Sequence, residues 1–165
     1  MRLSRTGVSI LVLAAAVCAA VPAPAASAAA AKPMASAATN WDGVTVDLMS
    51  VERKASVLTV KWAVRNEGES GVRVEFAFAG SWATTYAVDE ENGTKYFVLA
   101  DKEGQSLASE HEHISANKQG VSESIDAGGT ARFWMKFPAP PPEVKTLTLL
   151  FSETEPFEEV PITDR

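Results

Sequence analysis

The feature of this sequence that most limits its fold is an alternation of apolar and polar residues with a period of two. Each alternating run is typical of a strand with one face in a core and the other in water. There are five such runs: Val44–Leu48, Leu58–Arg65, Val72–Phe78, Ala131–Phe137 and Leu147–Ser152. No segment has the 3.6-residue apolar period of a long amphipathic helix. The sequence therefore predicts an all-β domain.

Turn-forming residues separate these runs. Asn66–Gly71 (NEGESG) and Asp126–Gly129 (DAGG) each precede a predicted strand. Pro138–Pro142 (PAPPP) follows another strand and ends it, because proline cannot donate to a sheet ladder. Short strands divided by such turns indicate an antiparallel β-sandwich.

One predicted hairpin lies near the middle of the chain. Asn92-Gly93 falls between Tyr86–Glu91 and Lys95–Asp101, and Asn-Gly is the preferred pair for a type I′ turn. The same Asn92-Gly93-Thr94 triplet also fits an N-glycosylation acceptor. The least regular stretch, Gln105–Gly120, is expected to be a long loop or a poorly formed strand.

The first 31 residues have the layout of a secretory signal peptide. Arg2 and Arg5 give a basic start, and Val8–Val17 is an apolar stretch of about ten residues, too short to span a membrane. Ala-x-Ala cleavage sites follow. All four Trp, two Tyr and seven Phe lie downstream, so the core-forming residues belong to the mature chain. Residues 32–40 are predicted to form a flexible leader, and residues 41–165 the sandwich domain.

Cleavage of the signal peptide would change both the cysteine content and the charge. The single cysteine, Cys18, lies in the apolar stretch, so the mature chain has no disulfide, catalytic thiol or Cys-based zinc site. Loss of Arg2 and Arg5 changes the formal net charge from −6 to −8. This balance argues against nucleic acid and anionic lipid as partners. We expect a secreted protein that is extracellular or periplasmic.

The motif with the clearest potential for metal binding is His111-Glu112-His113. Histidines at i and i+2 on a strand share a face and could share a metal ion. A metal site needs further ligands, of which Glu110 or Glu112 could supply one. The alternative is a solvated polar loop, so we assign no metal-binding residue.

Catalysis has little support in the sequence. The carboxylate pairs Glu90-Glu91 and Glu158-Glu159 are adjacent residues, which point to opposite faces of a strand and do not suit two-carboxylate hydrolysis. The chain has no Gly-x-Ser-x-Gly elbow and no phosphate-binding glycine motif. We assign no catalytic or cofactor-binding residue and predict that the protein is not an enzyme; a small secreted enzyme is the less favoured alternative.

Three tryptophans differ in their predicted surroundings. Trp62 falls in the core register of its run, like the buried tryptophan of an immunoglobulin-like sandwich. Trp134 falls in the opposite register, between Arg132 and Lys136, where those cations could stack on it. Trp82 lies near a turn. An exposed tryptophan can anchor a partner, and local packing is the alternative.

Longer stretches of the chain resemble a known group of proteins. They include Tyr86-x-x-Asp89 before Asn92–Tyr96, Ala127–Pro141 (AGGTARFWMKFPAPP), and Pro156–Ile162 (PFEEVPI). This sequence is similar to immunoglobulin-like β-sandwich domains of secreted bacterial proteins, including small actinobacterial antigens and lipoproteins. The resemblance covers residues 41–162 and implies no catalytic residue. We therefore expect a non-enzymatic module that binds a protein or polysaccharide partner.

Overall fold

A computed structural model describes residues 32–79, 85–109, 113–115 and 118–165. In these residues the chain is all-β, with strands and no helix, as the alternating runs predict. The strands are β1 (Ala35–Ala38), β2 (Val44–Lys54), β3 (Val57–Asn66), β4 (Val72–Ala79), β5 (Tyr86–Asp89), β6 (Thr94–Phe97), β7 (His113–Ser115), β8 (Lys118–Ile125), β9 (Thr130–Pro138), β10 (Thr146–Leu150), β11 (Phe157–Pro161) and β12 (Thr163–Asp164). The predicted signal peptide, residues 1–31, lies outside the described residues.

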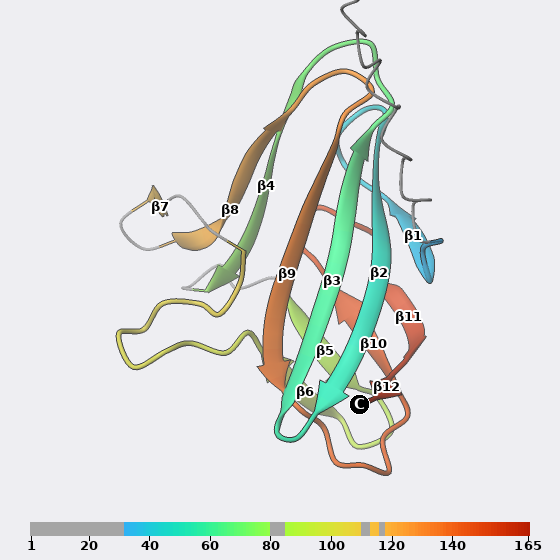
Figure 1. Cartoon of the computed structure of the whole chain (residues 1–165), viewed down its shortest axis with the longest axis vertical. Helices are drawn as coiled ribbons and strands as arrows, with labels where there is room; N and C mark the ends of the chain where they lie inside the picture. Colours follow the sequence, from blue (N-terminus) through green and yellow to red (C-terminus); the bar gives the residue numbers. More distant parts are fainter. Residues whose placement is uncertain (1–31, 80–84, 110–112, 116–117) are drawn as a thin grey trace, which may run out of the picture. The chain divides into compact units, whose positions relative to one another are not determined.

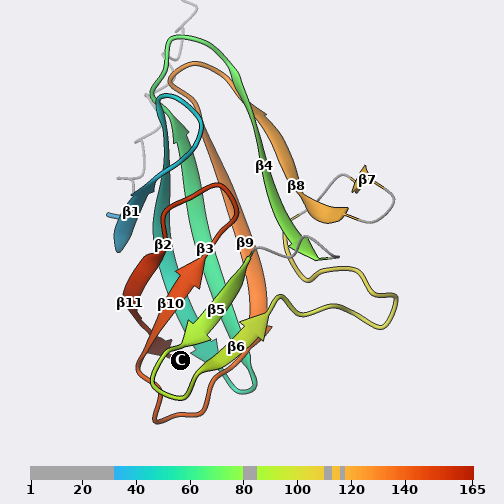
Figure 2. The same ribbon diagram turned by 180° about the vertical axis from the view of Figure 1, so that it is seen from behind.

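The strands form three hydrogen-bonded sheets (Figures 1 and 2). The largest has the order β1-β2-β3-β9, with β12 added to β2. A second has the order β11-β10-β5-β6, and a third has the order β4-β8-β7. All strand pairs are antiparallel except β12 with β2, which is parallel. The described part of the chain contains no helix of the length and apolarity that a membrane crossing requires.

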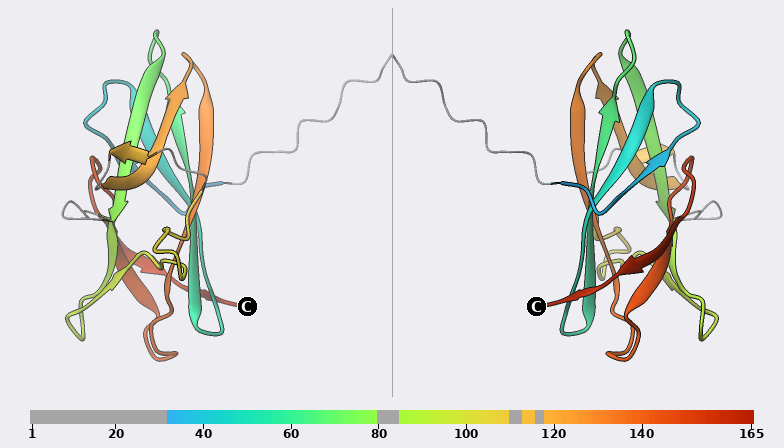
Figure 3. Two further views of the ribbon diagram at one scale, coloured as in Figure 1. Left: turned by 90° about the vertical axis from the view of Figure 1, so that its left-hand side faces the viewer. Right: turned by 90° about the vertical axis from the view of Figure 1, so that its right-hand side faces the viewer.

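These sheets pack in two layers, which confirms a sandwich-like arrangement. Figure 3 shows β2, β3 and β9 in one layer and β4, β5 and β10 in the other. Trp62 on β3 lies in the core between them and is 1% exposed. Its ring stacks on Phe133 of the same layer at 5.4 Å and meets Phe76 and Phe151 at 6.2 and 5.2 Å. The prediction that Trp62 faces the core is therefore confirmed.

The strand β1 corrects one expectation from the sequence. Residues 32–40 were expected to form a flexible leader, yet Ala35–Ala38 pair antiparallel with β2, with Ala37 opposite Val46. The amide of Met34 donates to the carbonyl of Leu48 at 2.7 Å. Small residues fit here because the edge of β2 supplies the hydrogen bonds and Ala37 needs little space in the core. The leader expectation is thus wrong for residues 35–38.

The predicted hairpin forms, but its turn differs from the prediction. Asp89 of β5 lies opposite Thr94 of β6, so four residues, 90–93, connect the strands. Gly93 has a positive φ of 62°, whereas Asn92 does not, and a type I′ turn requires positive φ at both central residues. The Asp89 carboxylate instead accepts hydrogen bonds from the Asn92 backbone and side-chain amides, at 3.2 and 2.8 Å. The type I′ prediction is therefore wrong.

Part of the irregular stretch Gln105–Gly120, residues 107–109, runs beside β9. The amide of Lys136 donates to the carbonyl of Leu107, and the amide of Ser109 donates to the carbonyl of Trp134, at 2.9 and 2.8 Å. These bonds make residues 107–109 a short, poorly formed strand on the outer edge of β9, as the sequence allowed. The stretch ends in β8, which begins at Lys118.

Asn66 joins two loops at one end of the sandwich. Its side-chain amide nitrogen donates to the carbonyls of Ser70, Ile125 and Asp126, at 2.8, 3.0 and 3.1 Å. Its amide oxygen accepts from the backbone of Gly68 at 3.0 Å. The residue is 1% exposed, so these bonds satisfy a buried polar group while they fix the β3–β4 loop against the end of β8.

Candidate binding surface on strand β9

The outer face of β9 carries Arg132, Trp134 and Lys136. The inner residues of this strand, including Phe133 and Met135, are buried in the core. Because side chains alternate between the two faces of a strand, the three outer residues share the solvent side of the sheet. Trp134 is 38% exposed, one of the few large apolar side chains on the described surface. The predicted register of Trp134 is therefore confirmed.

Neighbouring strand β3 adds a third cation to this surface. In the antiparallel register, Lys61 lies directly opposite Trp134 and Thr59 opposite Lys136. Directly opposed residues on one face have Cβ atoms about 5 Å apart. The Lys61 side chain is 53% exposed, so it can reach the ring from the β3 side. We call Lys61, Arg132, Trp134 and Lys136 the Trp134 surface.

Hydrogen bonds fix the backbone that presents the tryptophan. The amide of Trp134 donates to the hydroxyl of Ser109 at 2.7 Å, and its carbonyl accepts from the amide of Ser109 at 2.8 Å. The side chain of Trp134 is also held in contact: the Lys136 ammonium lies 5.5 Å from the centroid of its ring. The predicted cation stacking is thus confirmed for Lys136.

Two acidic residues of β2, Asp47 and Glu52, have cationic partners. Asp47 on β2 bonds Arg65 at 2.5 Å and accepts from the Ser36 hydroxyl at 2.6 Å. Burial raises the pKa of Asp47, but the hydrogen bonds from Arg65 and Ser36 outweigh it, so the pKa lies below its usual range. Glu52 bonds Arg165 at 3.1 Å and lies 4.0 Å from Lys61.

Arg132 and Lys136, by contrast, have no carboxylate within 4.0 Å among the residues that the structure describes. The Trp134 surface is therefore a locally positive area on an acidic protein. An unpaired guanidinium can hold a carboxylate through two parallel hydrogen bonds, and the lysines add point charges beside the ring.

The candidate metal motif lies largely outside the described residues. His111, Glu110 and Glu112 are not described, and the backbone of His113 opens β7 opposite Gln119. Among the described residues, no group of three or more His, Cys, Asp or Glu side chains could hold a metal ion. Trp82 also lies outside the described residues.

The two carboxylate pairs occupy different settings. Glu90 lies in the hairpin loop and accepts a hydrogen bond from the Thr148 hydroxyl at 2.6 Å. Glu158 and Glu159 form a bulge in β11, because Leu147 pairs with Val160 while Leu149 pairs with Phe157. Glu159 has a φ of 49°, and both glutamates are exposed. The bulge brings both to the surface, in place of the opposite faces expected for adjacent strand residues.

Sequence reasoning missed Lys61 as a member of the surface. The alternation around Trp62 predicts that Lys61 points outward. It does not predict which strand pairs with β3. Only the pairing of β3 with β9, which are distant in the chain, brings Lys61 beside Trp134.

Comparison of the chain with protein-family models, with curated proteins and with solved structures returns no match.

Proposed function

We propose that this protein is a non-enzymatic, secreted binding module that holds an anionic polysaccharide on the Trp134 surface. The observation that carries the proposal is one exposed tryptophan with cations along its own strand and opposite it on β3. The proposal includes export by a signal peptide over residues 1–31, and an immunoglobulin-like variant of the sandwich. Both come from the sequence. Outside the cell, envelope and extracellular polysaccharides are available partners.

The chemistry of the surface fits a sugar acid. An indole ring offers a flat apolar face on which the C–H groups of a sugar ring can pack, and its edge tolerates water. The Arg132 fork matches the geometry of a carboxylate. The Lys136 ammonium now lies over the ring, and its flexible four-carbon chain lets it move to a ligand carboxylate.

The shape of the surface favours an extended, repeating ligand. Outer side chains along one strand recur about every 6.8 Å, so Arg132, Trp134 and Lys136 present charge, ring and charge in a line. A polysaccharide lying along β9 would meet all three. Its affinity would depend on salt, because exposed charges are screened at high ionic strength.

Calorimetric titration of the mature protein with polygalacturonate tests this proposal, with neutral dextran as the comparison polymer. We expect binding to polygalacturonate that weakens as NaCl is added, and none to dextran. Trp134→Ala and Arg132→Ala should each weaken binding by about tenfold. Matched controls are Phe97→Ala and Lys95→Ala, which remove an exposed aromatic (52% exposed) and a ring-stacked cation from the β5–β6 hairpin.

Two results would overturn the proposal. One is Trp134→Ala binding polygalacturonate as tightly as the unchanged protein. The other is equal affinity for polyglutamate, which would show that charge alone, without sugar packing on the ring, drives the association.

A further inference from the structure

The loop of the β5–β6 hairpin holds an asparagine that is followed by glycine. The sequence has four asparagines, and only Asn92 precedes a glycine. An Asn-Gly pair is prone to deamidation, because glycine has no Cβ to hinder attack by its own backbone nitrogen. Asn92 and Gly93 are both exposed, and a Cβ placed on Gly93 would meet nothing within 4 Å. Water and space for the reaction are therefore available at this loop.

The reaction is an intramolecular substitution followed by hydrolysis. The Gly93 nitrogen attacks Cγ of Asn92, so an N–C bond forms and the Cγ–Nδ2 bond breaks. Ammonia leaves with the proton from the Gly93 nitrogen, and a succinimide ring remains. A water molecule from the solvent then opens the ring at either carbonyl carbon. The product is aspartate or isoaspartate, each with a negative charge that asparagine lacks.

Asp89 holds the Asn92 side chain in a position that opposes this attack. The Asp89 carboxylate is 3% exposed and accepts two hydrogen bonds from Asn92: one from the backbone amide at 3.2 Å and one from Nδ2 at 2.8 Å. Because one carboxylate binds both nitrogens, the side-chain amide is turned toward the backbone nitrogen of its own residue. The attacking nitrogen belongs to Gly93, on the other side of the Asn92 Cα. An intramolecular reaction is fast only when its atoms are aligned, so this contact slows it.

Release of this contact requires only that the end of the hairpin opens. Strand β6 is the last strand of its sheet, and Thr94, Lys95 and Phe97 on it are exposed. Segments with few buried side chains open locally at a lower free energy than the domain as a whole. In the opened loop, the Asn92 amide is free to rotate toward the Gly93 nitrogen.

We propose that Asn92 is a deamidation site that Asp89 holds in an unreactive position, and that opening of the β5–β6 hairpin releases it. The change runs in one direction, because ammonia is lost to the solvent. An aspartate at position 92 places a carboxylate where an amide donated to Asp89 at 2.8 Å, and like charges so close repel. The product therefore keeps the end of the hairpin open. This proposal stands independently of the polysaccharide on the Trp134 surface.

The first test compares the folded protein with a peptide of the same local sequence, acetyl-Asp-Glu-Glu-Asn-Gly-Thr-Lys-amide. Both are incubated in mildly alkaline buffer, and proteolysis with mass spectrometry then measures conversion at each asparagine. We expect the peptide to convert about a hundredfold faster than Asn92 of the folded protein. Equal rates would overturn the proposal, whatever the behaviour of any variant.

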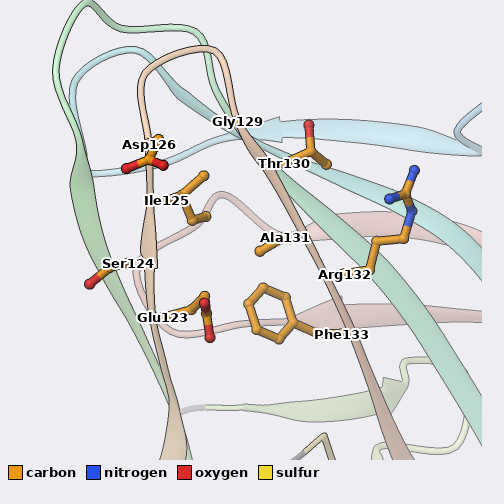
Figure 4. A pocket seen from close by; sticks show the side chains of 9 residues that line it. All are labelled: Glu123, Ser124, Ile125, Asp126, Gly129, Thr130, Ala131, Arg132 and Phe133. Atoms are coloured by element: carbon orange, nitrogen blue, oxygen red, sulfur yellow. The ribbon is translucent and has the colours of Figure 1, made fainter.

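The second test removes the carboxylate that holds Asn92. Asp89→Ala should speed conversion of Asn92 by about tenfold. Asp101→Ala is the matched control, because the exposed Asp101 carboxylate also accepts two backbone amides of its own turn, at 3.0 and 2.8 Å. Asp126→Ala removes an exposed carboxylate from the turn between β8 and β9, which Figure 4 shows. Neither control should change the rate at Asn92.

A variant destabilised elsewhere separates local release from general unfolding. Asn66→Ala removes buried hydrogen bonds from loops outside the hairpin. It should leave the rate at Asn92 unchanged, since the hairpin contact is intact and the folded state still predominates. A rate in Asp89→Ala no higher than in Asn66→Ala would overturn the role of Asp89.

Asn92→Asp reproduces one product and tests its effect on the hairpin. Amide hydrogen exchange in residues 94–97 should become about tenfold faster. Asn40→Asp is the matched control, because Nδ2 of Asn40 also donates to a carboxylate, that of Glu153, at 2.8 Å. It should leave exchange in residues 94–97 unchanged. Equal exchange in the two variants would overturn the opening of the hairpin by the product.

Discussion

Arg53 and Asp164 lie 111 residues apart in the chain and form a two-point ion pair. The Arg53 Nε lies 2.6 Å from Oδ1 of Asp164, and Nη2 lies 3.1 Å from Oδ2. The same guanidinium donates to the backbone carbonyls of Pro140, Pro141, Pro142 and Val144. Arg53 is 5% exposed, so one buried cation joins β2, the proline-rich connection and β12.

Arg53→Lys should destabilise the domain by about 2 kcal/mol. Lysine keeps the charge but lacks the planar fork, so it cannot satisfy the carboxylate and the proline-segment carbonyls together. Urea denaturation measures the loss. Arg73→Lys, at a side chain that is 55% exposed, is the control and should change stability by less than about 0.5 kcal/mol. Equal losses for the two variants would contradict this account of Arg53.

Asn66→Ala should cost about 3 kcal/mol of unfolding free energy, since it leaves three backbone carbonyls without their donor in a buried position. The comparison is Glu69→Ala in the same loop, which we expect to be nearly neutral. Thermal unfolding of both variants, at equal protein concentration, provides the measurement. A nearly neutral Asn66→Ala would show that the two loops hold together without this side chain.

Gly43 and Gly93 share a left-handed backbone conformation but differ in the space around them, so alanine substitutions at the two positions can be compared. Both have positive φ, 68° and 62°. A Cβ at Gly43 would lie 2.9 Å from the backbone nitrogen of Gly68, whereas a Cβ at Gly93 would meet nothing within 4 Å. Gly93→Ala should therefore cost about 1 kcal/mol, the penalty of the left-handed conformation alone, and Gly43→Ala distinctly more. The denaturant midpoints of the two variants provide the measurement. Equal losses of stability would contradict this prediction.

Asp47→Asn should make the unfolding free energy of the domain less dependent on pH in the acidic range. The pKa of Asp47 is lowered in the folded protein, so its contribution is fully present above about pH 4 and is lost as the pH falls through the folded pKa. At pH 7 the variant should be less stable by about 1–2 kcal/mol. Below the folded pKa of Asp47 the two proteins should converge. Urea denaturation at several pH values checks this, and a constant difference at every pH would contradict it.

The strands that the sequence predicts are those in which alternation and burial agree. In β3, the alternation of Leu58, Val60, Trp62 and Val64 matches the buried face of the strand. Such patterns are local, so a single chain is enough to read them. The outward register of Trp134 follows from the same alternation in β9.

Other elements depend on contacts that local patterns do not encode. Residues 35–38 are Ala and Ser with no strand-like alternation, and they become β1 because the edge of β2 offers hydrogen bonds. The hairpin turn is decided by the Asp89 carboxylate, which holds Asn92 in a longer loop. The position of Lys61 beside Trp134 likewise needs the register between two distant strands.

The parallel pairing of β12 with β2 sets an order of events during the making of this protein. Arg53 is synthesised more than a hundred residues before Asp164, and until that carboxylate is available the edge of β2 at Glu52 and Arg53 stays unpaired. A growing chain therefore cannot complete its largest sheet. The sheet reaches its full five strands only after β12 has been synthesised.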